Sequence, residues 1–390
     1  MRSIIIVFIT LIPLFSLAQQ NDTIERVILL YIDGFHPQAF EKYNLKNLKE
    51  IRQEGTSVSE GIMTFPVHPT IYGYGKFHTT SLPNITTLAG TAFLDEKQHF
   101  FHHNLPKNYI KLHAAGSNAY RSMNDGFNYV LTRSGVKDSV LIDFTIDAFE
   151  KENDIQFSRI HLQETGAAGR LGVGKQTGND QTIWADESPY QSAVTNADKQ
   201  IGRLFSYLKA KGKWESTLIV FMGDGQSAHG WHLYMFEDAW QTPIIFYGPK
   251  IKKNYQIPYA ENIDVIPTIA KLWNIKLSNI NIGGSGIVLN DIIIGQENHT
   301  EHPKWTKKIN NQQKEYTLLK AKADLKSAEN PKINFQLMEL MHQELSEHQF
   351  YGYDRIMEWK DAQTLEKMYL SNQWVIEKLK NILNEEKGYR

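Results

Sequence analysis

The chain has 390 residues, of which 41% are hydrophobic and 22% are charged, enough apolar material for one large core or two modest ones. It contains no cysteine, which excludes disulfide bonds, thiolate metal sites, cysteine nucleophiles and a lipid-modified N-terminal cysteine. The formal net charge of -1 provides no field that would attract a nucleic acid polymer or an anionic membrane. Any metal ligands must therefore be carboxylate, imidazole or hydroxyl groups.

The first 18 residues have the pattern of a secretory signal peptide. Arg2 supplies the positive start, Ile4 to Phe15 the apolar core, and Ser16 to Ala18 the small-residue cleavage pattern. The apolar core is too short to span a bilayer, and a polar stretch follows at once, which argues against an N-terminal membrane anchor. We therefore expect a secreted or periplasmic protein without a transmembrane segment in its mature chain.

Strand-like and helix-like segments alternate between residues 26 and 295. Continuous apolar runs are typical of buried parallel strands, whereas apolar residues spaced three and four apart are typical of helices. The alternation predicts an α/β fold in which helices sandwich a mostly parallel central sheet. The predicted strands are Val27 to Ile32, Ser158 to Leu162, Leu218 to Met222 and Thr242 to Ile251, and the predicted helices are Leu45 to Ile51, Tyr190 to Leu208 and Ile263 to Leu272.

Two stretches lack this alternation. Gly166 to Asp186 is rich in Gly, Gln and Asn and has no apolar period, so we predict a long loop there. After Gly295 the chain becomes rich in Lys, Asn and Gln, and helical patterns follow at Ile333 to Leu345 and Ala362 to Leu383. The predicted organisation is a signal peptide at 1–18, an α/β domain at 26–295 and a helical C-terminal appendage at 296–390.

Two carboxylates stand at strand ends. Asp33 follows the run VILLYI, and Asp224 follows LIVFMG. Open α/β sheets place their sites at the carboxyl ends of strands, so these two acids suggest a metal centre. Ser81 lies between them in the sequence, and a metal-activated hydroxyl is a known nucleophile in ester hydrolysis. Its alternative role is to cap a helix predicted to begin in the segment Asn84 to Gly90.

Several motifs resemble the alkaline phosphatase superfamily, most closely its nucleotide pyrophosphatase/phosphodiesterase branch. VILLYIDGF resembles the first-strand motif that ends in a metal-binding Asp and Gly-Phe, and SLPN at 81–84 resembles the T-F-P-N nucleophile motif with Ser in place of Thr. NIDVIPTIAKLWNI at 262–275 resembles the segment D-x-x-P-T-x-x-x-L-x-x-I. The resemblance covers Arg26 to Ile294 in the family's order.

This resemblance implies a two-metal site with three Asp and three His ligands. Asp33 occupies the first ligand position, and Ser81 occupies that of the nucleophile. The motif D-x-x-G-H aligns with Gly166 at its Asp and Arg170 at its His. Glycine has no side chain and arginine is a permanent cation, so neither binds a metal in the usual way.

The remaining ligands are retained only in part. Asp224 matches the Asp of the motif S-D-H-G, whereas Gly225 replaces its His. The last His matches His229, or His232 if the loop is shifted. The ordinary two-zinc centre is therefore not expected, and the implied cofactor is one divalent ion, zinc, calcium or magnesium, or no metal. Related sulfatases similarly hold one metal and use cations for the rest.

The resulting hypothesis is a phosphoester or sulfoester hydrolase acting on a small anionic ester. In it Asp33, Asp224 and His229 bind the metal, Ser81 attacks, and Asn84 and Arg170 hold the anionic oxygens. Thr64 is a rival nucleophile, and Glu164 would be a substitute ligand if the register were shifted.

Two further hypotheses stay open. One is a pseudoenzyme of the same fold that binds an anionic ligand or a partner without turnover. The other is a scaffold whose C-terminal helices recruit a partner protein. The sequence does not distinguish among the three.

Overall fold

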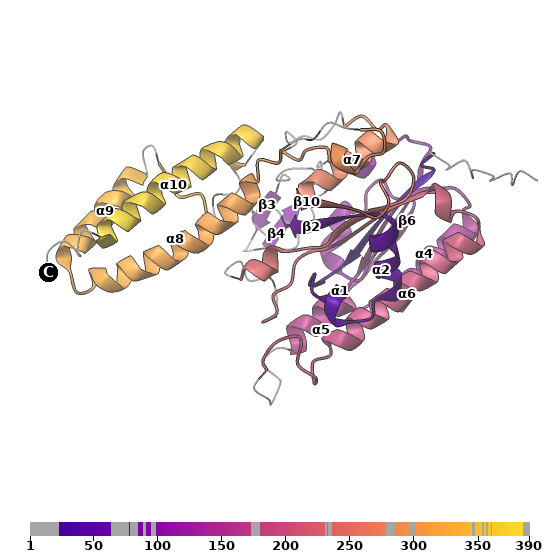
Figure 1. Cartoon of the computed structure of the whole chain (residues 1–390), viewed down its shortest axis with the longest axis horizontal. Coiled ribbons are helices and arrows are strands. Elements are labelled where there is room, and N and C mark those ends of the chain that lie inside the picture. The colour runs from indigo at the N-terminus through magenta and orange to yellow at the C-terminus, as the bar shows by residue number, and fades with distance from the viewer. Residues whose placement is uncertain are drawn as a thin grey trace, which may run out of the picture.

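The structure is a computed structural model in which an α/β body carries three long C-terminal helices (Figure 1). The predicted signal peptide and the residues Thr64, Ser81 and Asn84 lie outside the residues that it describes. None of the described helices combines the length and the apolar character that a membrane span requires. The described residues are 23–63, 78, 85–88, 91–94, 99–172, 180–230, 232, 236–277, 285–296, 299, 301–344, 348–352, 355, 358–359 and 361–384.

The central sheet has eight strands in the order β10-β2-β9-β8-β1-β7-β5-β6. Strand β9 is antiparallel to both of its neighbours, and the other seven strands share one direction. The predicted mostly parallel sheet is therefore confirmed. The strands are β1 (Arg26–Ile32), β2 (Thr56–Ile62), β5 (Ile110–Ala115), β6 (Tyr129–Thr132), β7 (Ile155–Leu162), β8 (Thr217–Gly223), β9 (Ile244–Tyr247) and β10 (Tyr255–Glu261).

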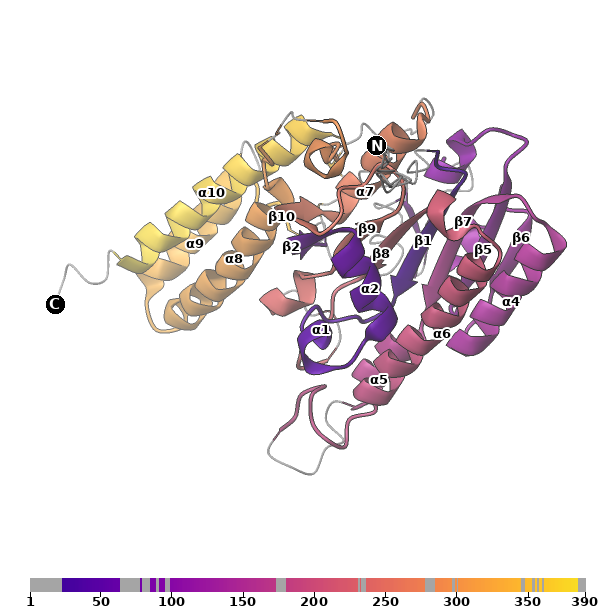
Figure 2. The same ribbon diagram turned by 45° about the vertical axis from the view of Figure 1, so that its right-hand side comes forward.

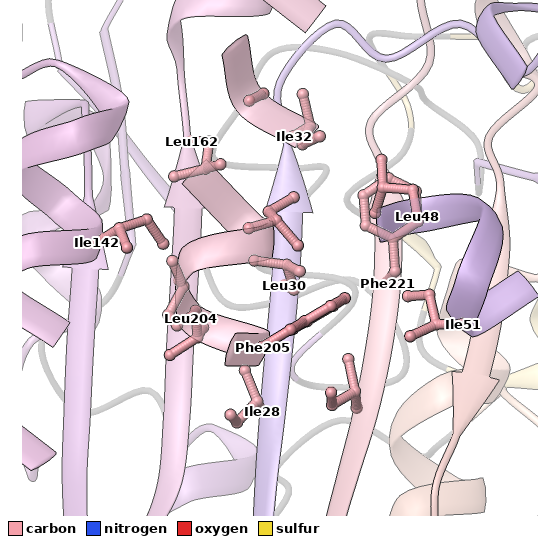
Figure 3. Packing of buried hydrophobic residues seen from close by; sticks show 14 of the residues in the cluster. Ile28, Leu30, Ile32, Leu48, Ile51, Ile142, Leu162, Leu204, Phe205 and Phe221 are labelled. Atoms are coloured by element: carbon pink, nitrogen blue, oxygen red, sulfur yellow. The ribbon is translucent and has the colours of Figure 1, made fainter. Parts of the chain in front are cut away.

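Apolar side chains cover both faces of this sheet. Ile28, Leu30 and Ile32 of β1 pack against the helices α2 (Lys46–Glu54), α4 (Asp138–Lys151) and α6 (Tyr190–Ala210), which lie together on one face (Figure 2). Figure 3 shows this layer, with Leu204 and Phe205 of α6 beside the β1 side chains. The alternate residues of β1 face a second cluster that includes α7 (Val265–Trp273). A strand buried on both faces reads as a continuous apolar run, which is why β1 was recognisable.

Shorter elements complete the description. A two-stranded antiparallel sheet joins β3 and β4. The C-terminal helices α8 and α10 pack against each other and against α9. The elements are α1 (Ala39–Lys42), β3 (Ile85–Leu88), β4 (Thr91–Leu94), η1 (Phe101–Asn104), η2 (Asn118–Met123), α5 (Glu164–Gly172), η3 (Trp214–Ser216), η4 (Glu237–Trp240), η5 (Asn262–Asp264), η6 (Asn290–Ile292), α8 (Trp305–Ser327), α9 (Pro331–Glu344) and α10 (Ala362–Asn384).

Three local predictions were wrong or incomplete. The predicted helix after Asn84 is instead strand β3, whose β-branched Ile85, Thr86 and Thr87 favour extended backbone. The predicted loop from Gly166 begins within helix α5. The polar tract after Gly295 contains helix α8, whose buried residues, such as Ile309 and Ala323, are too few to give a clear apolar period.

Helix α5 forms at a glycine-rich sequence because its first turn is capped from a distance. Asp138 Oδ1 accepts hydrogen bonds from the backbone N–H of Gln163 at 2.8 Å and of Glu164 at 3.3 Å. In return, Glu164 Oε2 accepts one from the N–H of Asp138 at 2.9 Å. These bonds join the first turns of α4 and α5. They satisfy backbone N–H groups that have no partner within either helix.

We predict that Asp138→Asn changes the pH dependence of stability. Burial raises the pKa of Asp138 to about 7. Because this carboxyl is neutral in the folded state below that value but ionised when unfolded, its contribution is largest at low pH and is lost as pH rises toward 7. Between pH 5 and 7, denaturation should show wild-type stability falling relative to Asp138→Asn by roughly 2 kcal/mol. Parallel pH profiles for the two proteins would contradict this assignment.

Candidate metal centre

Asp33 and Asp224 meet at the carboxyl edge of the sheet because their strands are paired. Ile32 of β1 is in register with Gly223 of β8, and each aspartate is the next residue of its strand. The N–H of Asp33 donates to the carbonyl of Leu162 in β7 at 2.9 Å, which fixes the turn at the strand end. The predicted convergence of two acids at the sheet edge therefore follows from ordinary parallel pairing.

A histidine completes a group of three buried ligand residues. One side-chain donor atom each from Asp33, Asp224 and His232 lie within 4.8 Å of one another. His232 Nε2 is 3.8 Å from Asp224 Oδ2. His229, by contrast, is exposed, and its ring packs at a tilt of 36° against Phe236 with 5.3 Å between centroids. The structure thus brings His232, the shifted-loop alternative, to the two acids and places His229 outside the group.

The electrostatics of this group suit a cation. Asp224 Oδ1 accepts a hydrogen bond from the N–H of Gly34 at 2.6 Å, but its buried Oδ2 has no hydrogen-bond partner among the described residues. Burial and the nearby Asp224 carboxylate raise the pKa of Asp33 well above its ordinary value, while burial lowers the pKa of His232. A neutral imidazole and two carboxylates are common ligands of divalent ions, and a bound cation would offset the repulsion between the acids.

Gly166 leaves room for the Asp33 carboxylate, and Gly34 leaves room for Gly166. Gly34 has a φ of 64°, and a Cβ there would lie 2.5 Å from the Cα of Gly166. A Cβ at Gly166 would lie 1.8 Å from Asp33 Oδ2. Any side chain at position 166 would displace the Asp33 carboxylate, so this position requires glycine. It is also the position that aligns with a missing metal ligand.

Gly225 is explained in a similar way. Its φ is 83°, and a Cβ would approach the carbonyl oxygen of Ala239 to 2.1 Å. A histidine at this position would need a different backbone. Arg170 lies exposed on α5, and its positive charge is a lesser influence that lowers the pKa values of both Asp33 and His232. The cation predicted from the sequence is thus electrostatically coupled to two of the three grouped residues.

Glu164 is engaged elsewhere. Its carboxylate accepts the Asp138 amide hydrogen bond described above, so the proposed shift in register is not observed. The neighbouring Gln163 instead forms a side-chain hydrogen bond with Asp33, which favours ionisation of that acid. The Gln163 side chain and the charge of Arg170 are the groups that partly offset burial of the Asp33 carboxylate.

Sequence reasoning missed a buried network beneath Asp33. Arg159 in β7 is fully buried and donates from Nε to His78 Nε2 at 3.0 Å. Its two other nitrogens lie 2.8 Å from His113 Nε2 and 3.4 Å from His161 Nδ1. A guanidinium only donates, so these facing imidazole nitrogens accept.

The network reaches the acid pair through one imidazole. With Nδ1 of His161 accepting from Arg159, its proton resides on Nε2, which lies 4.0 Å from Asp33 Oδ1 and 3.4 Å from the Tyr120 hydroxyl. Burial, with Arg159, lowers the pKa of His161 well below its ordinary value. The sequence signal was the pair Arg159 and His161 inside a strand whose residues are almost all buried.

Comparison with known proteins places the chain in a family. The profile named Sulfatase matches residues 53–275, more than half of the chain. The chain belongs to the sulfatase family. This membership and the sheet order confirm the expected alkaline-phosphatase-like fold.

Individual relatives are distant. The chain is 24% identical over 123 residues to a choline-sulfatase of Rhizobium meliloti, a match covering 30% of this chain and 24% of that protein. The matches to the first curated relatives span about a quarter or less of their lengths.

Solved structures share the fold at low identity. The phosphonate monoester hydrolase of Silicibacter pomeroyi has a TM-score of 0.52 and 14% identity, with 71% of this chain and 78% of that chain covered. Murine ectonucleotide pyrophosphatase/phosphodiesterase 5 has a TM-score of 0.50 and 13% identity, with 64% and 95% covered. These similarities show that the chain shares the fold of these two proteins.

We predict that Gly166→Ala destabilises the protein through Asp33. The added methyl group overlaps Asp33 Oδ2, and overpacking of this kind costs roughly 1–3 kcal/mol of unfolding free energy. Gly169→Ala is the matched control in the same helix, because the atom nearest to its Cβ would be Gln226 Nε2 at 3.2 Å, far beyond the 1.8 Å approach at Gly166.

A double-mutant cycle tests the cause. In Asp33→Ala protein, Gly166→Ala should cost clearly less than it does in wild type, because the colliding oxygen is gone. Denaturant unfolding of the four proteins gives the coupling. Additive effects, or an equal cost for Gly169→Ala, would contradict the proposed contact.

Proposed function

We propose that this protein hydrolyses a small sulfoester or phosphoester with one divalent ion bound by Asp33, Asp224 and His232. The observation that carries the proposal is the convergence of these three side chains within 4.8 Å at the carboxyl edge of the sheet. The buried Oδ2 of Asp224, which has no partner among the described residues, adds a second argument for a cation. Zinc, calcium and magnesium remain the candidates.

Ser81 is the proposed nucleophile. Its segment leaves β2 at Ile62, on the same sheet edge as Asp33 and Asp224. His78 precedes Ser81 by three residues, and its Nε2 lies 3.0 Å from Arg159 Nε. Arg159 also contacts His161, whose Nε2 is 4.0 Å from Asp33 Oδ1. Three residues of chain span at most about 11 Å, which supports the proposal that Ser81 acts at this edge.

The chain's own groups divide the proposed reaction among them. A bound divalent ion would supply charge stabilisation and favour ionisation of a hydroxyl. The Ser81 hydroxyl oxygen loses its proton to water as it attacks sulfur or phosphorus, and the bond to the leaving oxygen breaks. Water then cleaves the seryl ester, which releases the acid product and restores the Ser81 hydroxyl. Arg170 and Asn84 hold the non-bridging oxygens, for which a guanidinium and an amide are suitable donors. His229, at an exposed position, is proposed as proton donor to the leaving oxygen.

A specific observation also supports binding without turnover. The two positions aligned with missing ligands have no room for a side chain. Gly166 packs on the Asp33 carboxylate, and Gly225 packs on the Ala239 carbonyl. A second metal could not be held by side chains from these two positions. Arg170, with a cation held by the retained acids, would then bind an anionic ligand in a pseudoenzyme.

We predict that metal affinity depends on the ligand residues and not on the neighbouring histidine. Asp224→Asn and His232→Ala should each lower the affinity for calcium, magnesium or zinc by at least about 10-fold, measured by calorimetry. His229→Ala is the matched control and should leave metal affinity unchanged, because its ring lies outside the group. Equal loss in His229→Ala would contradict the assignment of His232.

Turnover distinguishes the two candidate functions. With 4-nitrophenyl sulfate, 4-nitrophenyl phosphate and bis(4-nitrophenyl) phosphate, the hydrolase hypothesis predicts activity that falls at least about 100-fold in Ser81→Ala. Ligand binding by wild type without hydrolysis would instead support the pseudoenzyme. Absence of both metal binding and anion binding would overturn both proposals.

We also propose that the protein is exported to the periplasm or secreted, on the basis of its first 18 residues. The expected outcome is a mature protein that begins at Gln19. N-terminal sequencing of protein recovered outside the cytoplasm tests this, and an uncleaved Met1 start on all exported material would contradict it.

A further inference from the structure

Helix α9 is apolar on two opposite sides. Ile333, Leu337 and Leu340 are buried, in a cluster with Val375 and Leu379 of α10. This contact accounts for the inner side of the helix. The outer side is where an ordinary surface helix would carry polar residues.

That outer side instead carries Phe335 and Met338. They are 66% and 54% exposed, and at 100° per residue they lie roughly opposite the buried stripe. Pro331, Phe335, Met338 and His342 recur at spacings of four, three and four, the spacing by which one helix packs along another.

The exposed apolar residues are concentrated in this part of the molecule. Of eleven large hydrophobic side chains exposed among the described residues, six lie on α8, α9 or α10. Scattered exposed apolar residues are normal, but a clustered set indicates an interaction surface. The three helices project from the α/β body in both views, so the outer side of α9 is accessible to another molecule (Figures 1 and 2).

The charged residues beside this stripe indicate what kind of partner would fit it. Lys332 and Glu339 are exposed on the same flank of the stripe, about 60° and 40° from Phe335 around the helix. A two-fold axis passing the helix between residues 335 and 336 would bring Lys332 of one copy level with Glu339 of the second copy, and the reverse. Antiparallel helices related in this way place the same flanks together, so the pattern is complementary to itself.

We propose that α9 is a self-association surface on which a second copy of this chain packs antiparallel, with Phe335 and Met338 at the centre and Lys332 paired with Glu339 at the rim. The surface is built from one helix stripe, so the expected dissociation constant is on the order of micromolar. An anionic membrane surface is a poorer fit, because Glu339 lies on the charged flank.

The test measures the mass of the full chain by sedimentation from about 1 to about 200 μM. Wild type should dimerise across this range, and Phe335→Asp with Met338→Asp should remain monomeric. Leu370→Asp is the matched control, because Leu370 is 59% exposed but lies on α10. Circular dichroism must show that each variant keeps its helical content.

Charge reversal tests the antiparallel geometry. Lys332→Glu alone and Glu339→Lys alone should each weaken the dimer by about 10-fold, whereas the double swap should restore it. A monomeric wild type at the highest concentration, equal disruption by Leu370→Asp, or failure of the double swap to restore association would overturn the proposal. Binding of the wild-type monomer to anionic vesicles, lost in the Phe335 and Met338 variant, would assign the surface to membranes instead.

Discussion

The arrangement of the site depends on two buried carboxylates that the sheet forces together. Asp33 and Asp224 are 8% and 1% exposed, and each follows a strand paired with the other's strand. Separating them would require breaking the pairing of β1 and β8 at the sheet centre. Since like charges repel strongly when removed from water, relief must come from a proton or a cation. The raised pKa of Asp33 means that, without a cation, this carboxyl takes up a proton more readily than an ordinary aspartate.

Helix α5 adapts the surroundings of this pair. Gly166 and Arg170 are four residues apart and therefore lie on one side of the helix. The glycine leaves space for the Asp33 carboxylate, and the arginine contributes positive charge that favours its ionised form. The helix start is held by Asp138, so the same reciprocal caps that stabilise the fold also orient the side of α5 that faces the acids.

The parts that could be predicted from the sequence are those set by strand pattern. The runs ending at Asp33 and Asp224 are buried on both faces, so their apolar composition is continuous, and parallel strands bring their ends to one edge. Helix α5 could not be recognised locally, because its cap, Asp138, is 26 positions away from Glu164. The choice of His232 over His229 depends on a loop path fixed by contacts such as that of the Ala228 amide with Asp238 at 2.7 Å.

In the proposed site, Asp33, Asp224 and His232 bind one divalent ion. Anomalous diffraction from crystals grown with manganese, read at the absorption edge of that metal, tests this most directly. We expect one strong peak between the three side chains, with ligand atoms at about 2.0–2.6 Å. Well-ordered density in which the two carboxylates point apart, or a manganese peak only at other residues, would contradict it.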